Sequence, residues 1–165
     1  MSDRATSRVG IVMGSRSDMA AGDKAAAVLM ELGLETEIRV ISAHRAPALL
    51  AMWVGSLEER GIGVVIAIAG LAAHLPGVVA AQTAVPVVGL PMPGGLADGL
   101  DALLSVVQMP KGVPVATVGV GNAENAALLA AQILAVGDPE LRTRFAARRA
   151  AQTRAVADDP ANEGL

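Results

Sequence analysis

Residues 64–90 read VVIAIAGLAAHLPGVVAAQTAVPVVGL, and this stretch decides the fold. It begins with a short apolar run at 64–69, continues as an Ala-rich segment of helical period at 75–82, and returns to a second apolar run at 85–90. Short apolar runs of this kind are typical of strands buried on both faces, and a helix between two of them is typical of a parallel sheet. The stretch therefore predicts one strand–helix–strand unit of an α/β protein.

The same alternation of apolar runs and Ala-rich segments extends in both directions along the chain. The sequence thus predicts a five-stranded parallel sheet in an α/β fold. The remaining predicted strands lie at 8–13, 36–41 and 115–120. The remaining predicted helices lie at 18–32, 46–60, 98–107 and 123–136.

A last amphipathic segment at 139–156 has no strand to follow it. Asp138 is suited to cap this segment as a helix, which would carry Arg142, Arg144, Arg148, Arg149 and Arg154. We expect a single domain over 1–165, with its core at about 8–137 and the last helix at about 138–157. The first seven residues and the tail from Asp158 are expected to be frayed.

Composition excludes several classes of protein. The chain has 165 residues, of which 53% are hydrophobic, with one Phe, one Trp and no Tyr, so its core is built from small aliphatic side chains. Thirteen basic and sixteen acidic residues, without a long basic run, argue against a nucleic-acid partner. The absence of cysteine excludes disulfides and thiolate chemistry. No apolar run has the form of a signal core or a membrane span, so we expect a cytoplasmic protein.

The turns that follow the strands are the candidate sites, because ligands of such sheets bind beyond the carboxyl ends of the strands. The first of these turns reads Gly14-Ser15-Arg16-Ser17-Asp18. Backbone N–H groups at a helix start and the two serine hydroxyls suit a phosphate. The alternative is that Ser17 or Asp18 only caps the helix. The turn matches neither the Walker nor the dinucleotide-binding glycine pattern.

The second turn contains Ser42, Ala43, His44 and Arg45, and Pro47 stands at the first turn of the next predicted helix. Histidine titrates near neutral pH, and a guanidinium group can hold a phosphate through two parallel hydrogen bonds. The alternative is a solvent-facing loop histidine beside a helix-capping serine.

The third turn places the other of the two histidines on the same rim, because its predicted strand neighbours the others. It contains small residues, which permit a ligand to lie against the backbone in a pocket with little water. The alternative is that they serve close packing of helix on sheet, with His74 capping the helix or bonded to a carbonyl. The residues concerned are Gly70, Leu71, Ala72, Ala73, His74 and Leu75.

The fourth predicted strand is followed by a loop at 91–95, which either folds over a ligand or is a structural turn. The run at 105–114 is assigned no chemistry.

Five blocks of sequence stand in order along nearly the whole chain. They are M-G-S-x-S-D at 13–18, S-A-H-R-x-P at 42–47, A-A-H-L-P-G at 72–77, S-x-V-Q-M-P-x-G-V-P-V-A-T-V at 105–118 and N-A-A-L-L-A-A-Q-I-L at 125–134. Together they resemble class I N(5)-carboxyaminoimidazole ribonucleotide mutase, the PurE family of de novo purine (IMP) biosynthesis. Class II relatives, which use free carbon dioxide, lack the third block in that place.

The resemblance implies a flavodoxin-like three-layer α/β/α sandwich with a doubly wound parallel sheet. It also implies a cytoplasmic homo-octamer, whose extra C-terminal helix packs on a neighbouring subunit, and no metal or organic cofactor. The implied activity is an isomerisation in which the carboxylate of a carbamate moves onto the imidazole carbon by decarboxylation and recarboxylation.

The resemblance also implies roles for individual residues of this chain. His44 would shuttle the proton. Ser15, Ser17, Ser42 and Arg45 would hold the substrate phosphate, with Ala43 beside them, and Asp18 would bind the ribose hydroxyls. The imidazole and carbon dioxide pocket would be lined by Gly70, Leu71, Ala72, Ala73, His74 and Leu75.

The third block is preceded by a departure from the family pattern. The family usually has A-G-A-G-G-A-A-H where residues 67–74 read AIAGLAAH, so that Ile68 and Leu71 replace glycines. Leu71 stands in the pocket loop, where a side chain could exclude substrate or change the backbone path. Two further functions remain open beside the mutase: an aminoimidazole ribonucleotide carboxylase that uses free carbon dioxide, and a non-catalytic nucleotide-binding module on the same scaffold.

Overall fold

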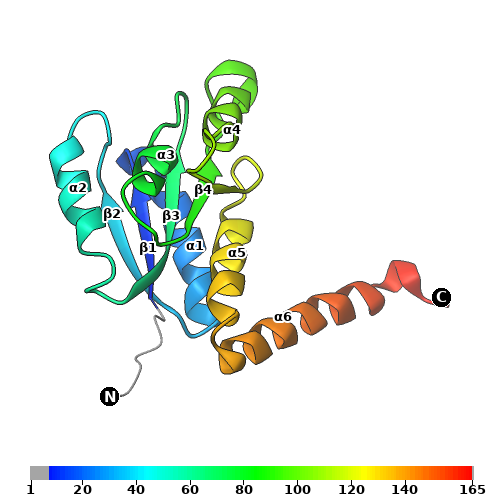
Figure 1. The fold of residues 1–165 in the computed structure, drawn as a ribbon. Helices are drawn as coiled ribbons and strands as arrows, with labels where there is room; N and C mark the ends of the chain where they lie inside the picture. Colours follow the sequence, from blue (N-terminus) through cyan, green and yellow to red (C-terminus); the bar gives the residue numbers. More distant parts are fainter. Residues whose placement is uncertain (1–7, 165) are drawn as a thin grey trace, which may run out of the picture.

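The computed structural model describes residues 8–164 as a five-stranded parallel sheet with helices on both faces (Figure 1). The strand order is β2-β1-β3-β4-β5, which confirms the predicted doubly wound α/β fold. The strands are β1 (Arg8–Met13), β2 (Glu35–Val40), β3 (Ile62–Ala69), β4 (Val87–Pro91) and β5 (Ala116–Thr117). The helices are α1 (Met19–Glu31), α2 (Pro47–Gly55), α3 (Leu75–Ala80), α4 (Leu100–Val107), α5 (Ala123–Ala135) and α6 (Pro139–Ala157). Short 3₁₀ turns are formed by Arg16–Asp18, Leu96–Asp98 and Pro160–Asn162.

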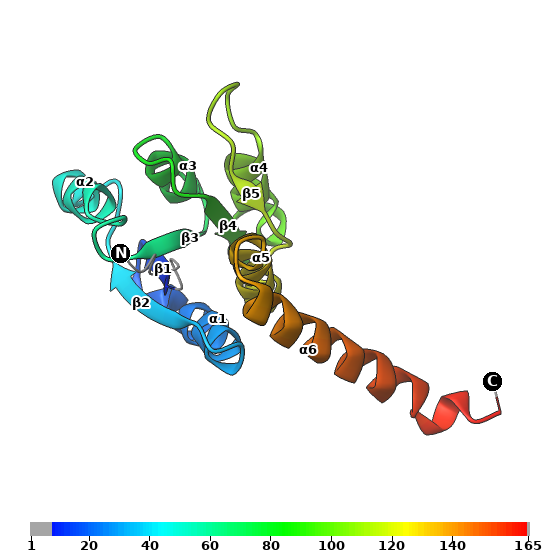
Figure 2. The ribbon, with the colours of Figure 1, turned by 60° about the horizontal axis from the view of Figure 1, so that its bottom comes forward.

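Two hydrophobic clusters lie on the two faces of the sheet, and together they make the three-layer sandwich (Figure 2). Successive strand residues point to opposite faces, so Ile11 packs beneath α1 and α5 while Val12 packs beneath α2. The helices α3 and α4 complete the second face. Because β3 is buried on both faces, its residues form the continuous apolar run from which the fold was predicted.

Glycines bring the layers together, as expected of a core built from small side chains. A Cβ on Gly22 of α1 would lie 2.5 Å from the terminal methyl of Met13 in β1. A Cβ on Gly89 of β4 would lie 2.9 Å from Val115 and would overlap Val106 of α4. At Gly89 the stiff side chains of Val106 and Val115 leave no room for a larger residue, whereas at Gly22 the obstacle is the flexible end of Met13.

Two elements, α2 and β5, are markedly shorter than the sequence predicts. Helix α2 ends at Gly55 rather than near residue 60, because the Ser56 hydroxyl and the Arg60 guanidinium both donate hydrogen bonds to the carbonyl of Trp53. Strand β5 pairs only over Ala116–Thr117, between a proline-containing loop and Gly119. It is an edge strand with a single neighbour in the sheet.

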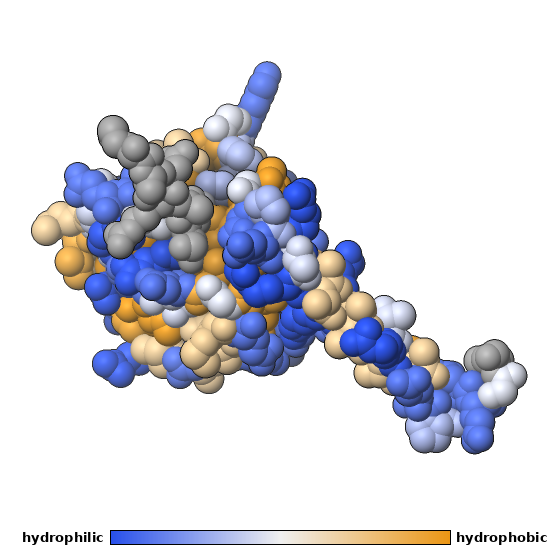
Figure 3. Space-filling view, turned by 90° about the horizontal axis from the view of Figure 1, so that it is seen from below, coloured by the Kyte–Doolittle hydropathy of each residue, from blue (hydrophilic) through white to orange (hydrophobic). Residues whose placement is uncertain are grey.

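Helix α6 projects away from the sandwich after the turn at Gly137 and Asp138 (Figures 1 and 2). The Asp138 carboxylate caps it as predicted, accepting a hydrogen bond of 2.9 Å from the Leu141 N–H. Leu141 is its one buried residue, and Figure 3 shows both apolar and polar side chains of the helix open to solvent. No helix within residues 8–164 combines the length and the apolarity that crossing a bilayer requires.

The structure describes the C-terminal tail of the chain up to residue 164. The first seven residues, predicted to be frayed, lie outside the described residues. The tail from Asp158, for which fraying stays a prediction, contains the 3₁₀ turn Pro160–Asn162. The Asp159 carboxylate caps this turn, and the Asn162 amide donates to the Val156 carbonyl at 2.7 Å. These two bonds give the tail a regular end.

Candidate active site

A pocket of about 450 Å³ opens at the carboxyl ends of the strands, where the loops after β1, β2 and β3 meet. Strands β1 and β3 are neighbours in the sheet. The connection that leaves β1 runs through α1 on one face, and the connection that leaves β3 runs through α3 on the other, so the pocket lies at the topological switch point. All the predicted site residues except Ala73 line it. Its lining comprises Gly14, Ser15, Ser17, Asp18, Ser42, Ala43, His44, Arg45, Ala69, Gly70, Leu71, Ala72, His74, Leu75, Met92 and Pro93.

The loop after β1 contributes hydroxyls, a carboxylate and open space. The Ser17 N–H donates to the Ser15 hydroxyl at 3.3 Å, so Ser15 caps the 3₁₀ turn while still lining the pocket. A Cβ on Gly14 would meet nothing within 4 Å, which leaves room against the backbone. Partial burial raises the pKa of the Asp18 carboxyl, and the hydrogen bond from the Ser17 hydroxyl offsets only part of this effect. Donors from a ligand would stabilise the charged carboxylate.

The loop after β2 is tied to the loop after β1 through Arg45. One guanidinium N–H of Arg45 donates to the Gly14 carbonyl at 2.8 Å. The Ser42 hydroxyl accepts from the Arg45 N–H at 3.3 Å, so this serine closes the turn, and Ala46 rather than Ser42 occupies the N-cap of α2. A guanidinium has several further donors, so the clamp leaves Arg45 able to bind an anion in the pocket.

The loop after β3 brings the second histidine against the first. Nε2 of His44 lies 2.8 Å from Nδ1 of His74, and the two rings stand edge to face with centroids 5.0 Å apart. The side chain of His74 makes no cap hydrogen bond to α3, although the residue occupies the N-cap position. The alternative in which His74 serves only as a helix cap is therefore wrong.

Leu71 has a positive φ of 56°, the backbone conformation that glycine adopts most easily. The loop thus follows a path suited to the usual family glycine, and the side chain stands 61% exposed at the pocket rim. Ala73 is the exception among the predicted lining residues. It is 1% exposed and packs in the cluster on the α2–α3 side of the sheet, because the loop turns its side chain inward.

Four lining residues were not among the predicted site residues. Gly14 and Ala69 stand at strand ends inside quoted motifs, and Met92 and Pro93 belong to the loop after β4. This loop closes onto the site because the Met92 N–H donates to the Ala69 carbonyl at 2.9 Å. Its place after a fourth parallel strand was the one sequence signal for it.

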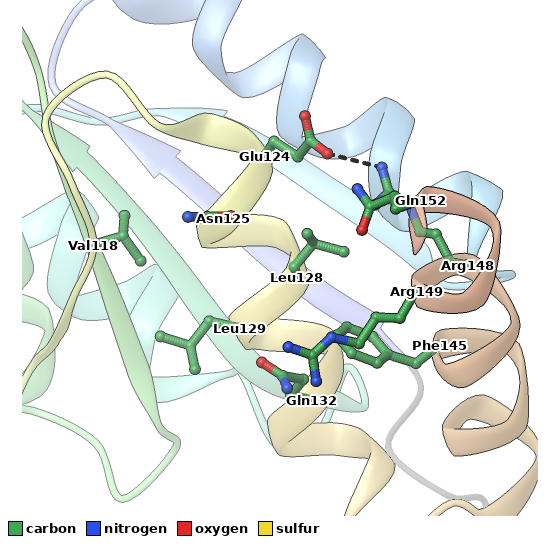
Figure 4. A pocket seen from close by; sticks show the side chains of 10 residues that line it. All are labelled: Val118, Glu124, Asn125, Leu128, Leu129, Gln132, Phe145, Arg148, Arg149 and Gln152. Carbon is green, nitrogen blue, oxygen red and sulfur yellow. Dashed lines mark hydrogen bonds and ion pairs between the residues drawn. The ribbon is translucent and has the colours of Figure 1, made fainter. Parts of the chain in front are cut away.

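A second pocket, of about 390 Å³, lies between α5 and α6 (Figure 4). Leu128 of α5 lies on the side of Phe145 and α6, whereas Leu129 lines the pocket on the side of Val118. Arg148 is engaged there, donating to Glu124 at 2.9 Å, and the Arg149 guanidinium lies over the Phe145 ring. Within residues 8–164 no group of three His, Asp or Glu side chains that could hold a metal ion gathers here or elsewhere.

Comparison with known proteins agrees with the geometry of the first pocket. The sequence model of the AIR carboxylase family matches residues 8–155. The chain belongs to this family. An AIR carboxylase relative from Mycobacterium tuberculosis, an N5-carboxyaminoimidazole ribonucleotide mutase, is 54% identical over 85% of this chain and 80% of its own length. A mutase of the same name from Vibrio cholerae is 50% identical over 92% of this chain and 96% of its own length.

Solved structures place this AIR carboxylase family member in the same fold. Treponema denticola PurE superimposes with a TM-score of 0.85 at 29% identity, covering 96% of this chain and 99% of the other. The flavodoxin-like sandwich predicted from the five sequence blocks is thereby confirmed, as is the resemblance to the PurE family.

Proposed function

We propose that this AIR carboxylase family member is an N(5)-carboxyaminoimidazole ribonucleotide mutase, an isomerase of de novo purine biosynthesis. The observation that carries the proposal is the convergence of His44, Arg45 and the Ser15–Ser17 turn on one pocket at the switch point. The relatives of similar length that carry the mutase name, at 50–54% identity, support it. A cytoplasmic location goes with the proposal, because a phosphorylated ribonucleotide does not cross a membrane unaided.

The phosphate and ribose are assigned to the first two loops. Arg45 supplies a fixed positive charge, and the hydroxyls of Ser15, Ser17 and Ser42 supply short donors beside it. Asp18 accepts from the ribose hydroxyls, which add donors to the single one that the Ser17 hydroxyl gives its partly buried carboxylate. Ala43 adds contact without a polar group.

His44 performs the chemistry as a proton shuttle. It transfers a proton to the carbamate nitrogen, the bond between this nitrogen and the carboxyl carbon breaks, and the electron pair of that bond stays on the nitrogen as carbon dioxide departs. The ring carbon of the aminoimidazole attacks the retained carbon dioxide. His44 then removes the proton from this carbon, which restores aromaticity and returns the imidazole to its starting state.

The third loop confines the carbon dioxide between these steps. Gly70, Ala72 and Leu75 offer small or apolar surfaces beside His74, so a neutral molecule can be held there against water. Retention of both fragments in one pocket makes recarboxylation effectively intramolecular, and effects of this kind contribute roughly 7–11 kcal/mol in well-oriented reactions.

The test is a coupled assay with the carbamate ribonucleotide on the wild type and two variants. We expect His44→Asn to abolish turnover while ribonucleotide binding persists, because the phosphate grip is untouched. Arg45→Ala should weaken binding by about 2–3 kcal/mol, the range for a lost charge-assisted hydrogen bond. Turnover retained by His44→Asn would remove this residue from the mechanism, and a wild-type binding isotherm for Arg45→Ala would remove the phosphate role.

The alternative carboxylase activity is the one named for a more distant relative. A chloroplastic phosphoribosylaminoimidazole carboxylase from Vigna aconitifolia is 49% identical, but the match covers only 27% of that longer protein. An enzyme that consumed aminoimidazole ribonucleotide with bicarbonate faster than it isomerised the carbamate would be a carboxylase. Phosphate binding without either turnover would indicate the non-catalytic nucleotide-binding module.

We further propose that the chain assembles as a homo-oligomer, an octamer, in which α6 packs on a neighbouring subunit. Apart from Leu141, α6 has no buried residue in the isolated chain, although it runs for 19 residues. Helix α4 also leaves Leu100, Leu104 and Val107 between 46% and 48% exposed at one helical face. A second copy of the chain would cover both surfaces.

A further inference from the structure

The contact between the two imidazoles is the only hydrogen bond that either ring makes within residues 8–164. His44 comes from the loop after β2 and His74 from the loop after β3, and these strands are not neighbours because β1 stands between them. The ring pair therefore joins loops from the two strands that flank β1, and Gly14 at the end of β1 lines the same pocket without a side chain. It lies at the centre of the proposed active site.

The two loops that carry His44 and His74 are both held by backbone hydrogen bonds. The Ala46 N–H donates to the Ser42 carbonyl at 2.9 Å and closes the turn around His44. On the other side, the His74 N–H donates to Ala72 and its carbonyl accepts from Val78 at 2.9 Å in the first turn of α3. The flanking Leu75 is buried. The two rings are thus held in contact by two separate elements.

A distance of 2.8 Å between two ring nitrogens requires one proton between them, because a neutral imidazole has one N–H and one bare nitrogen. In one arrangement, His74 donates from Nδ1, which leaves the neutral His44 protonated on its other nitrogen and unable to accept a further proton there. In the other, His44 donates from Nε2, which leaves its Nδ1 bare. Only the second arrangement gives His44 a nitrogen that can alternate between acid and base.

Few charged groups line the pocket together with the two rings. The titratable or charged residues that line the pocket with the two rings are Asp18 from the loop after β1 and Arg45 next to His44. The loop after β4 contributes Met92 and Pro93, which carry no charge.

We propose that His74 is a positioning residue that sets the tautomer of His44, because Nδ1 of His74 accepts a hydrogen bond from the Nε2–H of His44. Nδ1 of His44 is then the atom that exchanges the proton. As acid, His44 carries protons on both nitrogens and releases the Nδ1 proton to the carbamate nitrogen. As base, His44 keeps its Nε2 proton, which stays hydrogen-bonded to Nδ1 of His74, and its Nδ1 takes the proton of the ring carbon. His74 therefore gains and loses no proton.

The first test reads the tautomer and needs no turnover. The chain has two histidines, so ring-¹⁵N-labelled His74→Asn contains His44 as its only labelled residue and assigns the wild-type spectrum. Asparagine is the conservative variant, because its Oδ1 can accept in the place of Nδ1. We expect neutral His44 to carry its proton on Nε2 in the free wild type and in His74→Asn. In His74→Ala, which removes the acceptor, we expect a mixture of tautomers.

The second test is kinetic and rests on the proposed mutase function. We expect His74→Ala to lower kcat by about 10–100-fold, the range typical when a partner that orients a functional imidazole is lost. KM should change much less, and His74→Asn should recover most of the lost kcat. Circular dichroism checks the fold, which we expect to persist because the His74 side chain is exposed.

The outcomes separate this proposal from the function on which it rests. A wild-type His44 that carries its neutral proton on Nδ1, or a kcat that is the same in wild type and His74→Ala, would overturn the positioning role. A wild type that binds ribonucleotide without turnover would overturn the mutase, while the ¹⁵N spectrum would still decide the tautomer. An equal loss of kcat in His74→Asn and His74→Ala would also contradict the proposal, because acceptance of the hydrogen bond from His44 would then not be the function of His74.

Discussion

Leu71 has a φ of 56° in the pocket loop, a backbone conformation that costs a leucine about 1 kcal/mol relative to glycine. Its Cδ2 would lie 2.7 Å from a Cβ placed on Gly95, so the side chain reaches across to the loop that follows β4. The sequence left open whether Leu71 changes the backbone path or adds a side chain to the pocket. The backbone path suits the usual family glycine, so the added side chain at the pocket rim is the difference. Strain of this kind is typical of residues at functional sites.

We expect Leu71→Gly to be more stable than Leu71→Ala by about 1 kcal/mol, because both variants lose the same packing and only glycine relieves the strain at positive φ. Urea denaturation of the two variants measures this difference. The usual order, in which alanine is the more stable, would show that the loop does not hold residue 71 at positive φ. Both variants also remove the side chain from the pocket rim, so KM for the ribonucleotide should fall by a similar factor in each.

At the scale of elements, Glu37 joins strand β2 to helix α2. The Trp53 indole donates to its carboxylate at 2.8 Å, Arg60 forms a short ion pair with it, and Arg39 lies 3.4 Å away. Burial raises the pKa of Glu37, but the hydrogen bonds from Trp53 and Arg60 and the two positive charges outweigh burial and lower this pKa below its ordinary value of 4.5. The charged form is therefore the one that stabilises the fold.

We expect the contribution of charged Glu37 to the free energy of unfolding to be complete at neutral pH. It should be lost as the pH falls below the ordinary pKa of glutamate and then through the lowered pKa of Glu37 in the folded state, because the unfolded chain takes up the proton first. The free energy of unfolding of the wild type should therefore fall more steeply below about pH 4.5 than that of Glu37→Gln. Denaturant titrations between neutral and acidic pH measure both curves. Parallel curves would mean that Glu37 contributes nothing to the acid sensitivity.

The approach of α4 to β4 depends on Gly89. We expect Gly89→Ala to destabilise the protein by about 1–3 kcal/mol, because the added methyl group would overlap Val106 and press on Val115. Gly55→Ala is the matched control, since a Cβ there meets nothing within 4 Å. Thermal denaturation of both variants makes the comparison. Equal melting temperatures would show that α4 can shift outward without loss.

At the scale of the whole molecule, the proposed oligomer depends on α6. We expect the full chain to sediment as an octamer and a chain ending at Gly137 to form smaller assemblies, because the surface of α6 would no longer contact a neighbour. A chain ending at Ala157 keeps α6 and is the control for loss of the tail. Light scattering measures the masses, and circular dichroism checks that the sandwich remains folded. An unchanged mass without α6 would place the subunit contacts elsewhere.

Much of the molecule follows from the order of residue types along the chain. Apolar runs such as the one in β3 predict strands because only apolar side chains can be buried on both faces of a sheet. Pro47 and Asp138 predict helix starts because their effect is local. Parallel strands share one rim, so the positions of His44, Arg45 and His74 after their strands were enough to predict one pocket.

The tertiary structure decided what depends on distances between segments far apart in the chain. The sequence order does not show that β1 separates β2 from β3, so the direct contact of His44 with His74 could not be predicted from it. The inward side chain of Ala73, the closure of Met92 onto the site and the projection of α6 have the same origin. Local periodicity determines which face of an element is apolar, whereas packing determines which atoms of different elements finally meet.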